Sequence, residues 1–221
     1  MNTSRILILF AVISLAGLGN TFAQTLDISS GGAPTITGAL GGSVTGSSSV
    51  QSDLVVTVDF GELSPLNTNN IVNVKVPIAI RSQLPYQVSV TISGTTNSNT
   101  LALQRSDIGF GVNNMRAMGA QAQVCNNSPH IFYSPFNNDP TSSVTINSAG
   151  RATYTSTLNN ISGSTVILSG PKLTHNANVS RQTNDGYIFD AILAITPQFY
   201  ASGITSATLT FTISLGPVVI C

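Results

Sequence analysis

Hydrophobic and polar residues alternate along several stretches of the chain, with the period of two that is typical of β-strands. In residues 54–60, Leu, Val, Val and Phe alternate with Val, Thr and Asp. Residues 72–80 place Val or Ile at every second position, and residues 86–92 do the same with Tyr, Val, Val and Ile. Each stretch predicts a strand with one face toward a core. Pro77 has no N–H donor, so the second strand is predicted to lie at an edge or to contain a bulge.

The second half of the chain carries the same signal after a stretch that is harder to interpret. Residues 94–140 include runs rich in Asn, Gly and Met and predict loops with one or two short strands. Further strands are predicted at 144–147, 151–158, 165–168, 187–195 and 207–214. No stretch of a dozen residues shows a sustained helical period, apart from the apolar N-terminus.

Eight to ten strands separated by turn signals predict an all-β fold, an immunoglobulin-like antiparallel β-sandwich spanning about residues 53–215. The chain has no Trp, and its Phe and Tyr residues are scattered. This distribution disfavours an outer-membrane barrel, which carries aromatic girdles.

The first 23 residues have the pattern of a cleaved signal peptide. Arg5 supplies a positive charge, residues 6–19 form an apolar core that is short for a membrane span, and Ala23 is a small residue at the cleavage site. A membrane anchor is the alternative interpretation. Cleavage leaves an extension at 24–52 and a sandwich domain at 53–221, exported to the periplasm, the cell surface or the medium. No later stretch is apolar and long enough to span a membrane, so no integral membrane segment is expected.

Gly, Ser and Thr dominate residues 29–49, which precede the first of the core strands. This composition is typical of a flexible extension or linker. Within the segment every second position carries an apolar or a small residue, which is a strand pattern. These positions are Ile36, Gly38, Leu40, Gly42 and Val44.

Composition limits the partners of the chain. Charged residues make up 7% of the sequence and the formal net charge is zero, whereas roughly 25% of the residues of a soluble domain are charged. Near-zero charge disfavours nucleic acid and anionic lipid, because both attract clusters of Lys and Arg. The polar surface must consist mainly of Ser, Thr, Asn and Gln, which avoids like-charge repulsion when identical subunits pack together.

The two cysteines, Cys125 and Cys221, are candidates for a disulfide in an exported protein. A bond within one chain would close a long loop and stabilise the fold by about 4–5 kcal/mol in the chain-entropy model. Pairing of Cys221 with another molecule is the alternative, and the sequence does not choose between them.

Groups suited to catalysis are few. His130 and His175 are the only histidines, and neither lies in a metal-ligand spacing. A lone histidine in a polar loop is expected to be a solvated surface residue. The G-x-S-x-G motif is absent, and the eight acidic residues are too spread out to favour the carboxylate pair of a glycosidase. The sequence therefore predicts a non-enzymatic protein with no catalytic residue, no metal site and no cofactor.

Three short patches resemble the spore coat protein U-like and other chaperone–usher pilus subunits, in matching order along the chain. Residues 59–65 (DFGELSP) resemble the F-G-x-x-x-P element that follows their first core strand. Residues 84–90 (LPYQVSV) resemble their P-Y-x-V-x-L strand, and residues 200–213 resemble their closing strand, with Ile204 where Tyr is usual. The early cysteine pair of many such subunits is absent, and the chain continues past its last strand.

The resemblance implies a structural subunit of a pilus or coat, with other subunits as partners and a periplasmic chaperone and usher as assembly factors. Such a sandwich lacks one strand, and the N-terminal extension of a neighbour fills the groove by main-chain pairing. Ile36, Gly38, Leu40, Gly42 and Val44 would then be the donor-strand residues. A strand or coil of the same domain fits their pattern equally well.

A second hypothesis is an extracytoplasmic carbohydrate- or protein-binding module. Its site would lie in the loops of residues 94–140, where Asn113, Arg116, His130 and Tyr133 offer polar and aromatic contacts. A concentration-dependent polymer would favour the structural subunit, and a monomer that retains glycans would favour the binding module.

Overall fold

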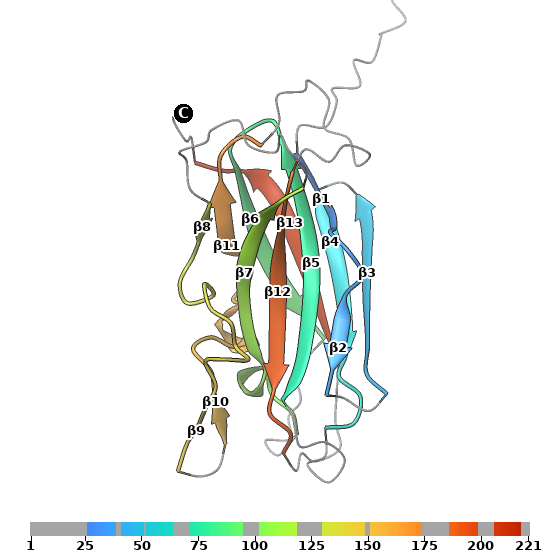
Figure 1. The fold of residues 1–221 in the computed structure, drawn as a ribbon, viewed down its shortest axis with the longest axis vertical. Helices are drawn as coiled ribbons and strands as arrows, with labels where there is room; N and C mark the ends of the chain where they lie inside the picture. Colours follow the sequence, from blue (N-terminus) through green and yellow to red (C-terminus); the bar gives the residue numbers. More distant parts are fainter. Residues whose placement is uncertain are drawn as a thin grey trace, which may run out of the picture.

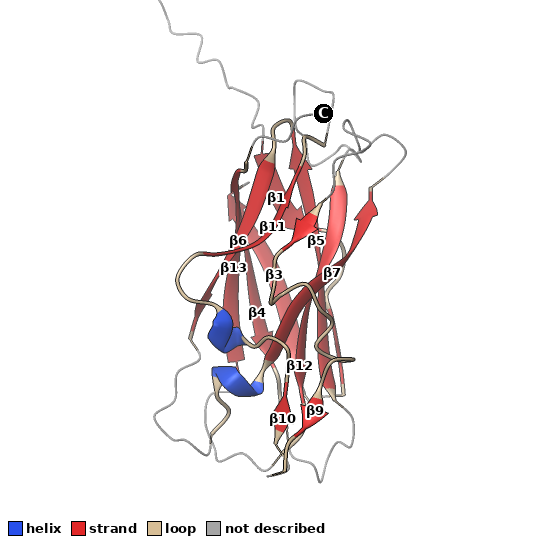
Figure 2. Ribbon diagram, turned by 90° about the vertical axis from the view of Figure 1, so that its left-hand side faces the viewer, coloured by secondary structure: helices blue, strands red, loops and turns tan. Residues whose placement is uncertain are grey.

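The computed structural model describes residues 26–38, 41–50, 52–63, 71–94, 102–118, 130–148, 151–173, 186–198 and 206–217. Within these ranges the protein is all-β, and antiparallel strands form two sheets packed as a sandwich (Figure 1). Two short 3-10 turns, η1 (Arg105–Asp107) and η2 (Leu158–Asn160), are drawn in blue in Figure 2. The all-β sandwich predicted from the sequence is confirmed, whereas the signal peptide lies outside the described residues.

Sheet I contains β1 (Leu26–Ser30), β2 (Thr35–Thr37), β5 (Val72–Ser82), β12 (Tyr187–Ile195) and β7 (Gly109–Ala117). Its order is β1-β5-β12-β7, and all neighbours are antiparallel. β2 pairs with the same strand as β1, namely β5, at the other end. β1 and β2 therefore act as one interrupted edge strand.

Sheet II contains β3 (Ser43–Val50), β4 (Asp53–Asp59), β13 (Ser206–Leu215), β6 (Tyr86–Ser93), β11 (Thr165–Gly170) and β8 (Ile131–Phe132), in this spatial order. β13 lies between β4 and β6. A separate hairpin of β9 (Thr145–Ile146) and β10 (Ala152–Thr153) extends from one end of the sandwich (Figure 1).

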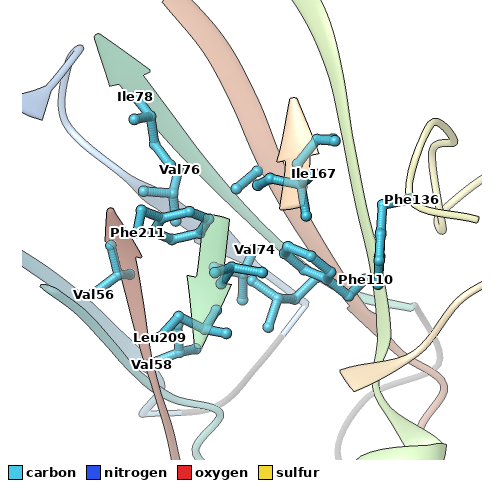
Figure 3. Packing of buried hydrophobic residues seen from close by; sticks show 14 of the residues in the cluster. Val56, Val58, Val74, Val76, Ile78, Phe110, Phe136, Ile167, Leu209 and Phe211 are labelled. Atoms are coloured by element: carbon cyan, nitrogen blue, oxygen red, sulfur yellow. The ribbon is translucent and has the colours of Figure 1, made fainter. Parts of the chain in front are cut away.

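The core fills the space between the two sheets and is built from the alternating apolar positions of the predicted strands. Val74, Val76 and Ile78 of β5 meet residues of β4 and β13 (Figure 3). Phe211 of β13 and Val56 of β4 are fully buried. The intervening positions of β13, which carry Thr or Ser, are only partly buried. Each strand thus places one face in the core, as the period of two requires.

Pro77 lies in a strand that is not at an edge, because β5 has neighbours on both sides. The carbonyl of Pro77 accepts a hydrogen bond from the N–H of Gly31 at 2.9 Å. Its nitrogen therefore faces the same side, since both groups of a residue in an antiparallel strand point one way. The neighbouring strand is interrupted there at residues 31–34, so the missing donor falls where no regular ladder exists.

β7 is the largest departure from the sequence-based prediction, which expected only short strands within residues 94–140. It is a strand of nine residues that pairs with β12. Its alternation is hidden by Gly109 and Gly111, at which side chains are sterically excluded. A Cβ at Gly111 would lie 2.2 Å from the carbonyl oxygen of Asn138. The strand predicted at 151–158 is also shorter than expected, because only Ala152–Thr153 is extended and η2 follows.

Candidate functional site

The N-terminal segment, predicted as an extension, supplies edge strands to both sheets. Ile36 of β2 pairs with Val74, and Val44 of β3 pairs with Val58. Both side chains are partly buried and pack against the core. In a single chain this segment therefore belongs to the sandwich, and residue 52 marks no break in it. The donor-strand hypothesis concerns a second chain and stays a prediction.

The other three positions of the predicted donor pattern lie between β2 and β3 in the sequence. Gly38 has a φ of 82°, and a Cβ there would lie 2.8 Å from the carbonyl oxygen of Ile71. This conformation and this close approach both require glycine. Gly42 is partly buried just before β3, and Leu40 lies outside the described residues.

The backbone of β4 alternates between its two neighbours, β13 and β3. The N–H of Ile213 donates to the carbonyl of Ser52 at 2.9 Å, in line with the ladder between β13 and β4. Ser52 and the even-numbered residues of β4 therefore direct their backbone groups toward β13. The odd-numbered residues of β4 direct theirs toward β3.

The free edge of sheet II is the outer side of β3, which no other strand of the described residues joins. Thr45 of β3 pairs with Thr57 of β4. Because Thr57 is one of the odd-numbered residues, Thr45 bonds inward to β4. Val44 and Gly46 consequently direct their N–H and C=O groups away from the sheet. These two residues are the template that the edge offers to another strand.

The opposite edge of the sandwich, at β7, is covered by the chain itself. The segment of residues 133–148 and 151–158, named the β7 cover here, lies beside the first half of this strand. The N–H of Val112 donates to the carbonyl of Phe136 at 2.8 Å, and the N–H of Phe110 donates to that of Ser156 at 3.0 Å. The hydroxyl of Ser156 donates back to the carbonyl of Phe110. Phe136 is buried with its ring edge-on to Phe110, the centroids being 5.6 Å apart.

A buried carboxylate links three strands of sheet I. Asp190 of β12 has a fully buried side chain that lies 3.0 Å from the Lys75 ammonium of β5 and 2.9 Å from the Arg116 guanidinium of β7. Asn114 has a φ of 58° at a bulge of β7, and its amide donates to Asp190 at 2.6 Å. A buried carboxylate needs such partners, because an unpaired buried charge is strongly destabilising. The cluster ties β5, β12 and β7 together.

His130 is partly buried against the sandwich rather than solvated at the surface, which corrects the sequence-based expectation. Its Nδ1 is 2.7 Å from the hydroxyl of the buried Tyr86, and its ring centroid is 4.4 Å from that of Tyr187. A Cβ at Gly170 would lie 2.7 Å from this Nδ1, so only glycine fits beside the ring. His130 therefore joins β6 and β12 at the entry to β8.

Burial sets the protonation of this cluster. It lowers the pKa of His130 to about 4 and raises that of Tyr86 well above its usual value, with a smaller contribution from Tyr187. The Nε2 of His130 is buried and has no hydrogen-bond partner among the described residues. Burial disfavours the charged imidazolium, so the imidazole is neutral at pH 7.

The four residues proposed for a binding module are not brought together as one site. Arg116 is paired with Asp190, and His130 is bonded to Tyr86. The hydroxyl of Tyr133 lies 3.0 Å from that of Ser169. Asn113 sits opposite Asp190 in the β7–β12 ladder. Arg116 and Asn113 thus both lie next to Asp190, whereas His130 and Tyr133 contact other residues.

Several predicted features lie outside the described residues, namely Cys125, Cys221 and His175. The predicted disulfide therefore stays a prediction. Across the described ranges, no three His, Cys, Asp or Glu side chains are grouped as a metal site would need. No helix in this part of the chain has the length and apolar character to cross a membrane.

Comparisons with family models, with curated proteins and with solved structures found no match. The function proposed below therefore rests on the residues and the geometry of this chain, together with the resemblance of its three patches.

Proposed function

We propose that this chain is an exported, non-enzymatic structural subunit, pilus- or coat-like, that works by associating with further subunits. One observation carries the proposal: the N-terminal segment forms the edge strands of both sheets, β1 and β2 on sheet I and β3 on sheet II. An edge strand contacts its sheet on one side only. The segment can therefore be exchanged for the same segment of a neighbour while the central strands stay in place.

The order of the strands supports an immunoglobulin-like arrangement of the kind that the resemblance implies. Immunoglobulin constant domains have sheets of order A-B-E-D and C-F-G. By position, β5, β12 and β7 correspond to B, E and D, and β6 and β13 correspond to C and F. β4 takes the place of G beside β13, although it comes from the N-terminal side of the chain. No strand of the described residues follows β13, as in a sandwich without a closing strand of its own.

The energetics permit the exchange of this segment between chains. Ile36 and Val44 pack against the core, and full burial of such side chains stabilises by roughly 1.5–3 kcal/mol each. Because the same contacts form within one chain or between two, exchange changes the stability of each sandwich little. The balance between closed monomers and linked subunits is then set by protein concentration.

The test is the association state of the mature chain, beginning at Gln24, followed over a range of concentrations by light scattering and electron microscopy. We expect oligomers or fibres that grow with concentration. Deletion of residues 24–49 should give a chain that accepts the missing segment as a peptide in trans.

A pair of point variants covers the case in which the deleted chain does not fold. Ile36→Asp places a carboxylate against the core of whichever sandwich the segment completes, so the segment should undock and association through it should be lost. Thr35→Asp, at the exposed neighbouring position, should not weaken association. A mature chain that stays monomeric at every concentration and retains glycans would overturn the proposal in favour of a binding module.

A further inference from the structure

We propose that the free edge of β3 is a docking surface for a second copy of this chain. The second copy adds its own β3 in antiparallel orientation and joins the two copies of sheet II into one continuous sheet. The inference rests on the proposed function in that it names the surface through which subunits associate side by side. It requires no strand exchange, and the experiment below separates the two.

β3 is the one long sheet edge that the described part of the chain leaves unprotected. The β7 edge is covered at Phe110 and Val112 by the β7 cover. At the opposite end of sheet II, β8 has only two residues. The β1–β2 edge is interrupted and carries Asp27, which is paired with Arg81 at 3.2 Å. Short, covered or charged edges are the usual protection against strand pairing.

Over residues 43–47, β3 has none of these protections, and its ladder with β4 shifts register only after Ser47. It runs for eight residues, SVTGSSSV, without a charge or a proline, and it forms the outermost strand of its sheet (Figure 1). Its outward backbone groups are those of Val44 and Gly46, as the ladder with β4 requires. A partner strand would therefore bond to these two residues.

The sequence of β3 is complementary to itself in the register centred on Thr45. There Val44 lies opposite the partner's Gly46, and Gly46 lies opposite the partner's Val44. Each such pair exchanges N–H and C=O bonds in both directions, because both residues face outward. A Cβ at Gly46 would contact nothing within 4 Å. This open space receives the side chain of the partner's Val44, and each Thr45 meets the partner's Thr45 as a cross-strand pair.

A second copy is the occupant that fits best, because the pairing is two-fold symmetric and uses the same surface on both molecules. Identical charged strands would repel each other at such an axis, whereas β3 is neutral. The chain as a whole has zero formal net charge and few charged residues, so long-range repulsion between copies is small.

The first experiment blocks the edge without disturbing the sheet. In Gly46→Pro the lost N–H is one that points away from β4, and Gly46 is not among the residues of positive φ. Proline is tolerated at such edge positions. We expect the sandwich to fold and the dissociation constant of the dimer to rise at least about tenfold, because two outward donors are lost per dimer. Gly46→Ala is the matched control and should still dimerise.

The second experiment reads the register directly. Residues opposite each other in a non-hydrogen-bonded pair have Cα atoms about 4.5 Å apart, which a disulfide can bridge. Thr45→Cys should therefore form covalent dimers under mild oxidation. Ser43→Cys is the control, because the two substituted positions would be about 13 Å apart along the strands. Mass mapping of the linked peptides distinguishes the new bond from bonds of Cys125 and Cys221.

The outcomes separate this inference from the proposed function. Loss of side-by-side dimers in Gly46→Pro, together with cross-linking of Thr45→Cys, supports the β3 contact. Association of Gly46→Pro equal to that of the unaltered chain overturns the inference, while subunit assembly through the exchanged segment survives. Absence of association in the unaltered chain overturns both.

Discussion

The two long edges of the sandwich differ in whether their backbone groups are covered by the rest of the chain. At β7, main-chain groups of the β7 cover bond to Phe110 and Val112, and an aromatic side chain anchors the covering segment in the core. At β3, the equivalent backbone groups of Val44 and Gly46 find no partner strand in the described residues. Both edges have the same hydrogen-bonding chemistry. An edge is closed or open because of what the rest of the chain packs against it.

The two edges each contain a glycine, and the space beside these glycines differs. At Gly111 a side chain is excluded by the carbonyl oxygen of Asn138, which approaches from the β7 cover. At Gly46 the corresponding space is empty. The first glycine admits a segment of the same chain, and the second leaves room for a different molecule.

Removing the anchor of the β7 cover should have the largest effect. Phe136→Ala deletes a buried ring packed edge-on to Phe110, and we expect a loss of about 3–5 kcal/mol in the free energy of unfolding. Urea denaturation measures this loss. Asn137→Ala, at the exposed neighbouring position, is the control and should change stability by less than about 0.5 kcal/mol.

Hydrogen exchange tells whether the covered edge has opened. The Val112 amide, which donates to the carbonyl of Phe136, should exchange faster in Phe136→Ala, whereas amides between β4 and β13 should be less affected. Equal acceleration at both places would show that the cover is not a separate unit.

Acid should destabilise the side of the sandwich at which the β7 cover begins. The pKa of His130 is lowered from 6.5 to about 4 by burial. Between these pH values, the unfolded chain binds a proton at His130 and the folded chain does not. Stability from this group is complete above about pH 6.5, and about 3 kcal/mol is lost as the pH falls to about 4. Unfolding curves at pH 7, 5 and 4 should show this slope. In His130→Gln the slope should be smaller, and an unchanged slope would assign the acid sensitivity to carboxylates.

The smallest effects come from paired glycine substitutions at the two edges. Gly111→Ala forces the backbone of the β7 cover to move, and we expect a loss of about 1–3 kcal/mol. Gly46→Ala adds a methyl group in open space and should stay within about 0.5 kcal/mol of the unaltered chain. Thermal unfolding of both variants under one set of conditions measures the difference. Comparable losses would mean that β3 is covered as β7 is.

The strands that the sequence predicted well are those with one face in the core, such as β4, β6 and β13, because burial of one face imposes a period of two. β7 was not predicted from the sequence, because its glycines are required by contacts with a segment that follows more than twenty residues later. Residues 29–49 look like a linker by composition, yet Ile36 and Val44 pack against the core from edge strands. The buried Asp190 had a signal in the sequence, since a carboxylate within an apolar strand requires a cation nearby. No signal in the sequence indicated which cation would lie there.

The place of β13 also has a kinetic consequence. This strand is the last in the described chain, yet it lies in the middle of sheet II and joins β4 to β6. A polypeptide that emerges N-terminus first therefore holds two separate half-sheets, β3-β4 and β6-β11-β8, until residues 206–215 arrive. Pairings between distant parts of a chain form slowly, and the waiting half-sheets expose unpaired strands. Sheet II can thus be completed only once the whole chain is available. A chain truncated before β13 would keep unpaired strand edges that are prone to aggregation.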